Sequence, residues 1–270
     1  MVRQTDIRMR TSGIHTLMVA PYGSSMDLSG SIALVTGANR GIGRHFVEQL
    51  HDRGASKIYA TARSPRSADL PGVETLPLDI TDPDSVAAAA VAASDVTLLV
   101  NNAGVSTAQN LVTGDLTKIR LEMDTHFYGT LAMVRAFAPV LAGNGGGAVL
   151  NVLSRLSWLS YLGANAYSAA KAAEWSLTNG IRLELREQGT LVTGLVLSST
   201  DTDMMAGWDI PKNDPADVVR AALDGLEAGR FEILADRDSA EAKAALSTDP
   251  GVLYAQTGCN AVKLKSILDG

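Results

Sequence analysis

Cysteine is almost absent from this chain of 270 residues, and the single one, Cys259, has no partner for a disulfide within the chain. The chain is nevertheless long enough to bury a large core without covalent cross-links. A lone thiol fits a reducing compartment, so we expect a cytoplasmic protein.

Positive charge and aromatic residues are scarce as well. The 23 Lys and Arg residues against 29 Asp and Glu residues give a formal net charge of −6. Without a basic excess there is no long-range attraction for nucleic acid or for an anionic membrane surface, and we expect neither partner. Aromatic residues make up 5% of the chain and apolar residues 46%, which predicts a core of close-packed Ala, Val and Leu side chains.

Long apolar runs are also missing. The run Leu17–Ala20 is too short for a membrane span or a secretory signal. We expect residues 1–25 to form a flexible extension, residues 26–256 a single domain and residues 257–270 a C-terminal tail. The segment Met26-Asp27-Leu28-Ser29-Gly30 leads into the first predicted strand. We therefore take Met26 as an alternative start of the natural protein, which a native N-terminal sequence beginning earlier would exclude.

Short aliphatic runs alternate with longer amphipathic segments, a pattern typical of βαβ units and a parallel sheet. The fold class predicted is α/β, a single doubly wound Rossmann-type domain with a mostly parallel seven-stranded sheet. Pro139 is expected to end or bend the last turn of its helix. The predicted strands are Ile32–Val35, Lys57–Thr61, Val73–Leu78, Val96–Val100, Ala148–Val152, Leu191–Leu197 and Glu232–Leu234, and the predicted helices are Gly41–Arg53, Pro83–Ala93, Thr117–Leu141, Ala164–Glu187 and Pro215–Glu227.

A glycine-rich turn follows the first predicted strand and leads directly into a helix. Gly37 permits a tight turn, Gly41 lets the backbone approach a pyrophosphate, and Gly43 lets the helix pack on the strand while its amino end faces the anion. The pattern predicts a dinucleotide site, although a plain loop remains the alternative because such turns are common. The whole turn reads Thr36-Gly37-Ala38-Asn39-Arg40-Gly41-Ile42-Gly43.

The residues after the second predicted strand indicate which nucleotide is bound. The segment Thr61-Ala62-Arg63-Ser64 contains no acid that would accept a hydrogen bond from a ribose 2′-hydroxyl. Arg63 offers a charge-assisted contact to a 2′-phosphate, and Arg40 can reach it from the glycine-rich turn. We therefore expect NADP(H) as the cofactor, the alternative being that both arginines are ordinary surface residues.

Three further residues form a catalytic pattern. Tyr167 and Lys171 stand four residues apart at the start of a predicted helix, so both side chains project from one face, and Ser154 follows the preceding strand. A carbonyl oxygen that receives a hydride needs a proton, and a tyrosine, with an ordinary pKa of about 10, serves better beside a cation. Lys171 supplies that charge, and Ser154 supplies a hydroxyl to hold the substrate oxygen.

These motifs, together with Asn101-Asn102-Ala103-Gly104, resemble the short-chain dehydrogenase/reductase family in order and spacing from Leu28 to about Leu234. The resemblance implies an NADP-preferring carbonyl reductase or alcohol dehydrogenase. It also implies that Tyr167 is the general acid and base, that Lys171 lowers its pKa and binds ribose, and that Ser154 orients the substrate.

The same resemblance implies further cofactor contacts and no metal. Asp79 and the adjacent Ile80 resemble the adenine contact of the family, and Thr202 resembles the threonine that holds the nicotinamide carboxamide. The residues alone leave other roles open, with Asp79 as a turn acid and Thr202 as a loop hydroxyl. The positions that resemble the sheet-edge and cofactor-lining residues of the family are Asn102, Ala103 and Gly104.

Two positions depart from the family pattern. His126-Phe127-Tyr128-Gly129 stands where the family has an asparagine that seats a water linking the lysine to solvent. His126 therefore performs this relay by another route, breaks it, or is simply a packed histidine. Leu197-Ser198 replaces a Pro-Gly pair after the sixth predicted strand, which leaves the geometry of the cofactor loop open.

Substrate and assembly are predicted from apolar residues. The segment Met204–Asn213 and the region from Leu156 to Leu162 carry apolar side chains that suit a small apolar carbonyl or alcohol substrate, although core packing would explain them too.

The helices Thr117–Leu141 and Ala164–Glu187 carry apolar residues beyond what one sheet face needs, and in the family these helices form a dimer interface, so we expect a homodimer or homotetramer. These extra residues include Leu131, Val134, Leu177 and Ile181.

The function predicted is an NADP(H)-dependent oxidoreductase that transfers a hydride between nicotinamide and a carbonyl or secondary alcohol. The principal alternative is an NADP(H)-binding module without turnover, acting as a sensor or scaffold. Dehydratase or epimerase chemistry on a nucleotide-linked sugar is less favoured, because it predicts a longer substrate domain than 236–270 offers.

Overall fold

A seven-stranded sheet with the strand order β3-β2-β1-β4-β5-β6-β7 organises the computed structural model, which describes residues 25–65 and 70–255. Every pair of neighbouring strands is parallel, so the predicted α/β fold is confirmed and the sheet is parallel throughout. The strands are β1 Ile32–Thr36, β2 Lys57–Ala62, β3 Val73–Pro77, β4 Leu98–Asn101, β5 Ala148–Ser154, β6 Leu191–Leu197 and β7 Glu232–Leu234.

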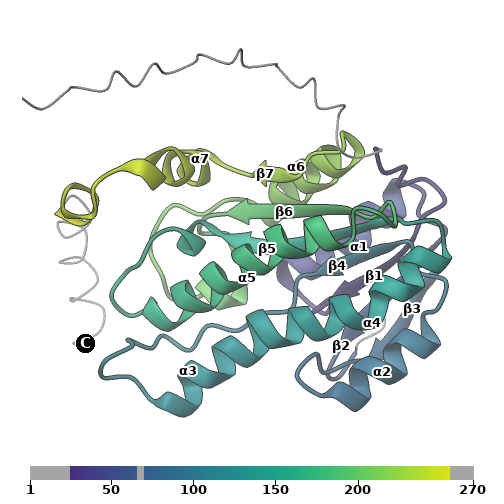
Figure 1. The fold of residues 1–270 in the computed structure, drawn as a ribbon, viewed down its shortest axis with the longest axis horizontal. Helices are drawn as coiled ribbons and strands as arrows, with labels where there is room; N and C mark the ends of the chain where they lie inside the picture. The colour runs from purple at the N-terminus through teal and green to yellow at the C-terminus, as the bar shows by residue number, and fades with distance from the viewer. Residues whose placement is uncertain (1–24, 66–69, 256–270) are drawn as a thin grey trace, which may run out of the picture.

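Helices cover both faces of the sheet (Figure 1). Alternate residues of β1 point to opposite faces, so that Ala33 and Val35 pack with α1 and α6, while Leu34 packs with α2, α4 and α5. The helices are α1 Gly41–Asp52, α2 Pro83–Ala92, α3 Leu116–Met123, α4 Thr130–Gly143, α5 Asn165–Glu184, α6 Pro215–Glu227 and α7 Arg237–Ala244. No helix in the described ranges is long and apolar enough to cross a membrane.

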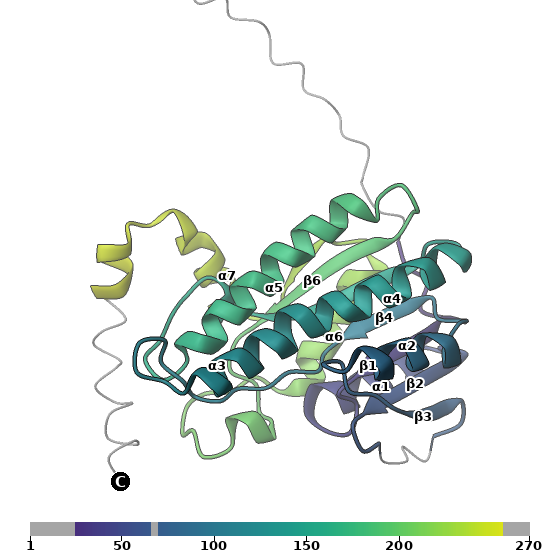
Figure 2. The same cartoon turned by 60° about the horizontal axis from the view of Figure 1, so that its bottom comes forward.

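The predicted helix Thr117–Leu141 has a more complex structure than its sequence indicates. A π-helical stretch, η1 Asp124–Gly129, joins α3 to α4 without a break, and Figure 2 shows the combined rod beside α5. Pro139 does not end this rod, because α4 continues to Gly143. Burial of Leu141 and the hydrogen bonds that the Asn144 N–H donates to Val140 and Leu141 stabilise the last turn.

The prediction of surplus apolar residues on the helices Thr117–Leu141 and Ala164–Glu187 is largely wrong. Val134, Leu177 and Ile181 are buried in the core between the helices and the sheet, and Leu131 is partly buried against it. They therefore cover the sheet instead of extending a free surface. The large apolar residues exposed on α3, η1, α4 and α5 are Leu116, Leu121, Tyr128 and Leu183.

The predicted helix starts at Pro83 and Pro215 are confirmed. The Asp82 carboxylate accepts a hydrogen bond from the Asp84 N–H at 3.0 Å, and Asp214 accepts one from the Ala216 N–H at 2.8 Å. Helix α7 is an element that the sequence patterns did not predict. The predicted N-terminal extension up to Ser24, the predicted tail 257–270 and Cys259 lie outside the described residues.

The strand order reverses between β1 and β4. The chain builds β1, β2 and β3 in one direction, then returns to place β4 on the other side of β1. The connections after β1 and β4 therefore diverge to opposite faces and leave a crevice at the carboxyl ends of these strands, where ligands bind in open α/β sheets.

Candidate active site

The glycine-rich turn leaves the carboxyl end of β1 in a conformation that requires its glycines. Gly37 and Gly41 have φ angles of +68° and +53°, and a Cβ on Gly43 would collide with the Gly37 carbonyl oxygen. No side chain caps the amino end of α1 at Arg40 in the described structure. The first N–H groups of α1 thus remain available to an anion, as a phosphate site requires.

Asn102 and Thr36 lock the turn to the end of β4. The Thr36 hydroxyl oxygen accepts hydrogen bonds from the N–H groups of Asn102 and Ala103, each at 2.9 Å. The Asn102 side-chain amide donates to the carbonyl oxygens of Thr36 and Gly37 at 2.8 and 3.3 Å. The side chain of Asn102 therefore braces the turn, and Ala103 lies against Gly37.

The residues predicted to select the nucleotide lie near the ends of β1 and β2. The Asn39 amide donates to the Ser64 carbonyl oxygen at 2.8 Å, which ties the turn to β2. The Arg40 guanidinium forms an exposed ion pair with Asp203 at 3.0 Å. Arg63 is exposed, and its charge is close enough to contribute to the lowered pKa of Asp79.

Asp79 is held as a turn acid. Its carboxylate accepts hydrogen bonds from the Thr81 N–H at 3.0 Å and from the Thr81 hydroxyl at 2.7 Å, and these bonds are the main cause of its lowered pKa. Ile80 is buried in the core. The geometry therefore favours the simpler alternative for Asp79, an acid that shapes the turn before α2.

The loop after β6 closes onto the glycine-rich turn. A Cβ on Gly41 would lie 3.2 Å from the Thr202 methyl group, which brings Thr202 next to the phosphate-binding turn. The Asn213 amide donates to Ser198 Oγ at 3.1 Å and to Asp236 Oδ2 at 2.9 Å. These bonds fix both ends of the loop, so Ser198 and Asp236 stabilise this segment in place of the family's Pro-Gly pair.

Ser154, Tyr167 and Lys171 meet at the carboxyl end of β5. Ser154 is the last residue of the strand, whereas Tyr167 and Lys171 lie in the first two turns of α5. The Lys171 ammonium nitrogen lies 5.9 Å from the centre of the Tyr167 ring. Burial raises the pKa of the Tyr167 phenol above 10.0, Glu174 raises it further, and Lys171 and a hydrogen bond from Ser154 counteract the rise.

Lys171 itself is buried and doubly bound. Its ammonium group donates to the Val152 carbonyl oxygen at 2.7 Å and to Glu174 Oε2 at 2.6 Å. An ammonium group has three N–H donors, so one donor remains for a hydroxyl group of a bound ribose.

His126 packs beside Tyr167 at the π-helical stretch. The two rings meet edge to face with centres 5.2 Å apart, and His126 Nε2 lies 2.7 Å from the Val105 carbonyl oxygen. Burial, followed by the charge of Lys171, lowers the pKa of His126 well below 6.5, so the ring is neutral and donates from Nε2. His126 Nδ1 lacks a hydrogen-bond partner among the described residues and lies 3.7 Å from Glu174 Oε2.

Two buried acids at this site escaped the sequence analysis. Glu122 on α3 accepts hydrogen bonds from the Thr107 N–H and hydroxyl at 2.6 and 2.5 Å, and Glu174 lies on α5. Their signal was present, since each acid stands at a core-facing helical position three or four residues from His126 or Lys171. Within residues 25–65 and 70–255, no group of three or more His, Cys, Asp and Glu residues could hold a metal ion.

Comparison with known proteins places this geometry in context. The family model for short chain dehydrogenases matches residues 31–212. L-xylulose reductase of Bos taurus is 30% identical over 248 residues, covering 84% of this chain and 98% of the reductase.

Two solved structures of short chain dehydrogenases are also similar to this chain. A short chain dehydrogenase from Burkholderia cenocepacia J2315, in complex with NADP, has a TM-score of 0.82 and 38% identity, over 86% of this chain and 98% of that one. A short chain dehydrogenase/reductase from Burkholderia phymatum, in complex with NAD, has a TM-score of 0.73 over 80% of this chain and 93% of that one. At 23% identity, this second structure supports the fold alone.

The contact between Gly104 and His126 generates a prediction. A Cβ on Gly104 would lie 2.7 Å from His126 Cε1, and the Val105 carbonyl and the Tyr167 ring leave His126 little room to move. We expect Gly104→Ala to lower the free energy of unfolding by about 1–3 kcal/mol, measured by urea denaturation. The control is Gly143→Ala at the exposed end of α4, where nothing lies within 4 Å. An equal free energy of unfolding for Gly104→Ala and the native chain would contradict this packing.

Proposed function

The chain belongs to the short-chain dehydrogenase family and is an oxidoreductase, and we propose that it interconverts a carbonyl compound and a secondary alcohol with NADP(H). The observation that carries the proposal is the meeting of Ser154, Tyr167 and Lys171 at the carboxyl end of β5, on the same edge of the parallel sheet as the glycine-rich turn after β1. A phenol, an ammonium group and a hydroxyl at one point suit proton transfer to a carbonyl oxygen.

Several residues suit a dinucleotide. The amino end of α1 fits a pyrophosphate, because no side chain among the described residues caps its first N–H groups. Gly37, Gly41 and Gly43 allow the turn in front of it to pack closely on Ala103, Thr202 and the turn's own backbone. The free donor of Lys171 fits a ribose hydroxyl, and Thr202 lies where the loop meets the turn. When bound, the nicotinamide supplies or accepts the hydride.

We assign the proton to Tyr167. In carbonyl reduction the Tyr167 phenol donates its proton to the substrate oxygen, while the Ser154 hydroxyl holds that oxygen. The raised pKa of Tyr167 keeps the phenol protonated at neutral pH, which suits the reductive direction. In alcohol oxidation the same oxygen must first lose its proton, and the charge of Lys171 favours this ionisation.

NADP(H) is favoured over NAD(H) by Arg63, which stands where an acid would contact a 2′-hydroxyl. Arg40 can add a second charge, because its ion pair with Asp203 is exposed on both sides and such pairs are worth only about 0–1 kcal/mol. The Burkholderia cenocepacia relative was solved with NADP, which supports the same assignment.

The substrate we propose is a small apolar ketone, aldehyde or secondary alcohol. Leu162, after β5, and Met204 and Ile210, after β6, are exposed on the loops that flank Tyr167 and Thr202. Exposed apolar side chains at the mouth of a site favour an apolar ligand.

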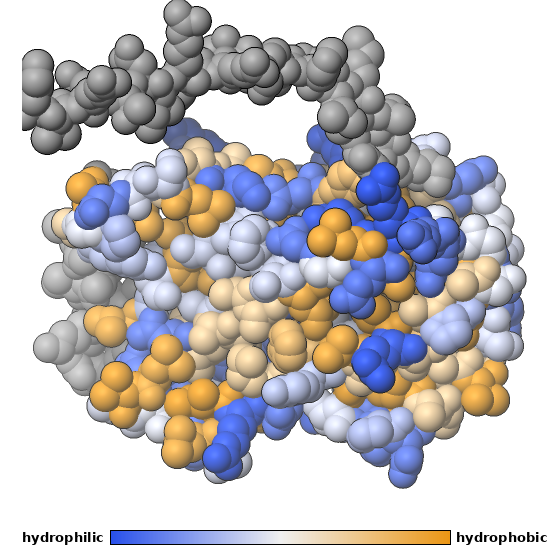
Figure 3. Space-filling view, in the orientation of Figure 1, coloured by the Kyte–Doolittle hydropathy of each residue, from blue (hydrophilic) through white to orange (hydrophobic). Residues whose placement is uncertain are grey.

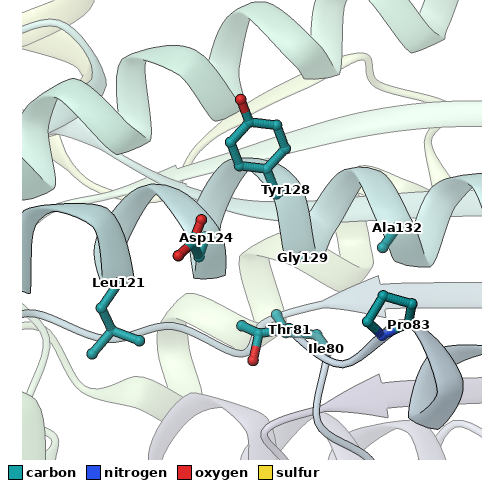
Figure 4. Close-up of a pocket in the computed structure, with 8 residues that line it drawn as sticks. All are labelled: Ile80, Thr81, Pro83, Leu121, Asp124, Tyr128, Gly129 and Ala132. Carbon is teal, nitrogen blue, oxygen red and sulfur yellow. The ribbon is translucent and has the colours of Figure 1, made fainter. Parts of the chain in front are cut away.

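A cytoplasmic homodimer or homotetramer remains our proposal for the assembly. Apolar residues gather across the middle of the face that α4 and α5 form (Figure 3). On the same rod of helices, Leu121, Tyr128 and Ala132 border a hollow of about 300 Å³ opposite Ile80 and Pro83 (Figure 4). The hollow is mainly apolar, although Thr81 and Asp124 also line it, and a mainly apolar hollow beside an apolar face suits contact with a second subunit.

Two observations favour a nucleotide-binding module without turnover. Glu174 already neutralises the ammonium group of Lys171, and the neutral His126 stands in place of the family's asparagine. Under this alternative, both features act against the ionisation of Tyr167. A direct measurement of turnover therefore decides between an enzyme and a nucleotide-binding module.

The first prediction concerns the phenol. We expect Tyr167→Phe to lower kcat for carbonyl reduction about 10²–10⁴-fold, because it removes the proton donor, with NADPH binding retained. The measurement is NADPH absorbance against a panel of aldehydes and ketones. Tyr128→Phe, the same change on an exposed residue of η1, serves as the control. Retained turnover in Tyr167→Phe, or none in the native chain across the panel, would exclude the proposed role.

The pH dependence of the two directions gives a second prediction. Because the pKa of Tyr167 is raised, the phenolate fraction at neutral pH is small and grows by up to about tenfold per pH unit. Alcohol oxidation should therefore accelerate from pH 6 to pH 9, whereas carbonyl reduction stays nearly constant. Steady-state kcat in both directions measures this, and an oxidation rate independent of pH would count against Tyr167 as the base.

Cofactor choice gives a third prediction. We expect Arg63→Ala to raise KM for NADPH about 10–100-fold and to leave KM for NADH unchanged, because only NADPH has the 2′-phosphate. Arg220→Ala on α6, which also removes an exposed guanidinium, is the matched control. A native preference for NADH would reject the assignment.

A further inference from the structure

Glu174 is a buried acid that the proposed function does not yet use. Its side chain is 2% exposed, and Oε2 lies 2.6 Å from the Lys171 ammonium nitrogen. Oε1 accepts a hydrogen bond from the Thr130 hydroxyl at 3.1 Å, so α4 fixes the carboxylate from the other side. Glu174 and Lys171 are three residues apart on α5 and form a buried pair held at both ends.

His126 does not compete for this carboxylate. Its ring is neutral and its Nε2–H is donated to the Val105 carbonyl oxygen, so Nδ1 faces Glu174 as an acceptor, 3.7 Å away. Two acceptors cannot form a hydrogen bond with each other. Lys171 is therefore the cation that Glu174 serves.

A buried ammonium group needs such a partner. Removal from water favours the neutral amine, and an isolated lysine in a protein interior readily loses its proton. Burial alone lowers the pKa of Lys171, whereas the charges of Glu174 and Tyr167 and the hydrogen bond to Glu174 outweigh it, so the pKa rises above 10.5. The pairing thus decides whether Lys171 carries a charge.

We propose that Glu174 is a positioning residue that keeps Lys171 charged and aimed at the catalytic site, and so controls, through Lys171, the ionisation of Tyr167. Its catalytic consequence rests on the proposed function, but the pairing with Lys171 does not. Two opposing effects follow from one side chain. Glu174 directly disfavours the phenolate by its own charge, and it indirectly favours the phenolate by maintaining the ammonium group.

The titratable groups around Lys171 come from three elements and must each be considered in the test. Helix α5 supplies Tyr167 and Glu174, α3 supplies Glu122, and η1 supplies the neutral His126. Glu122 also raises the pKa of Tyr167 by its charge, but it contacts Thr107 and not Lys171. Glu122→Gln is therefore a matched control that removes a buried acid and leaves the counter-ion of Lys171 in place.

The charge of Lys171 can be measured directly in the protein without cofactor or substrate. In protein labelled with ¹³C-lysine, the Cε resonance of Lys171, assigned by its loss in Lys171→Met, reports the protonation of the ammonium group. We expect Lys171 to stay charged from pH 6 to pH 10 in the native chain, in Glu122→Gln and in the conservative Glu174→Asp. In Glu174→Gln the resonance should titrate within this range, a fall in pKa of about 1–3 pH units.

The outcome that overturns the proposal is a Lys171 resonance in Glu174→Gln that titrates as in the native chain. If Glu174→Gln does not fold, the double variant Lys171→Met/Glu174→Gln decides. A double variant that folds supports the pairing, because removing both partners leaves no buried charge unpaired. A double variant that also fails to fold overturns it.

The effect of Glu174 on catalysis is measured separately, by the pH profile of alcohol oxidation. With Lys171 neutral, alcohol oxidation by Glu174→Gln should require a higher pH than in the native chain, whereas Glu122→Gln should shift the profile to lower pH. Opposite shifts cannot arise from a merely structural role or from the simple loss of negative charge. If the lysine titration succeeds and no turnover is found in any variant, the pairing stands and the proposed function fails. Equal shifts in both variants reject the control of Tyr167 by Glu174.

Discussion

A buried ammonium group is the constraint around which this site is built. Lys171 is 5% exposed, and its position is stable only because Val152 and Glu174 take up two of its donors. Breaking a buried pair on one side costs far more than the pair contributes, so the arrangement tolerates little change. The same burial makes the charge of Lys171 effective on Tyr167, because no water screens it.

The fold determines where this charge lies. The strand order reverses between β1 and β4, and Thr36 and Asn102 join the two strand ends across the reversal. The next strand, β5, ends at Ser154, and α5 returns over the sheet with Tyr167 and Lys171 in its first turns. Gly104, after β4, packs directly against His126 on η1, because a Cβ on Gly104 would collide with the His126 ring. The carboxyl ends of the strands thus bring the glycine-rich turn, Tyr167 and Lys171 to one edge of the sheet.

The sequence predicted the parts of this site that depend on local spacing. The glycine-rich turn, the Asp-Pro helix starts and the Tyr167–Lys171 spacing are local, since each needs only neighbouring residues and standard geometry. The α/β fold followed from the alternation of strands and helices. The roles of the individual site residues remain predictions.

Features that depend on tertiary packing were missed or wrong. Whether Val134 and Leu177 cover the sheet or face a partner depends on how the helices sit, which periodicity alone does not fix. The π-helical stretch at His126 has no sequence signal comparable to a cap. Only packing brings Glu122 to Thr107, whereas Glu174 stands three residues from Lys171 on the same helix, a local spacing that the sequence analysis did not use.

The central claim is that this site moves a hydride and a proton to a carbonyl group, and isotope transfer tests it most directly. NADPH in which both hydrogens on the reactive carbon of the nicotinamide are deuterium is incubated with the native chain and a mixture of small apolar aldehydes and ketones. The account predicts an alcohol with deuterium on its carbinol carbon. NADPH that binds to the folded chain but transfers no label to any product would contradict it.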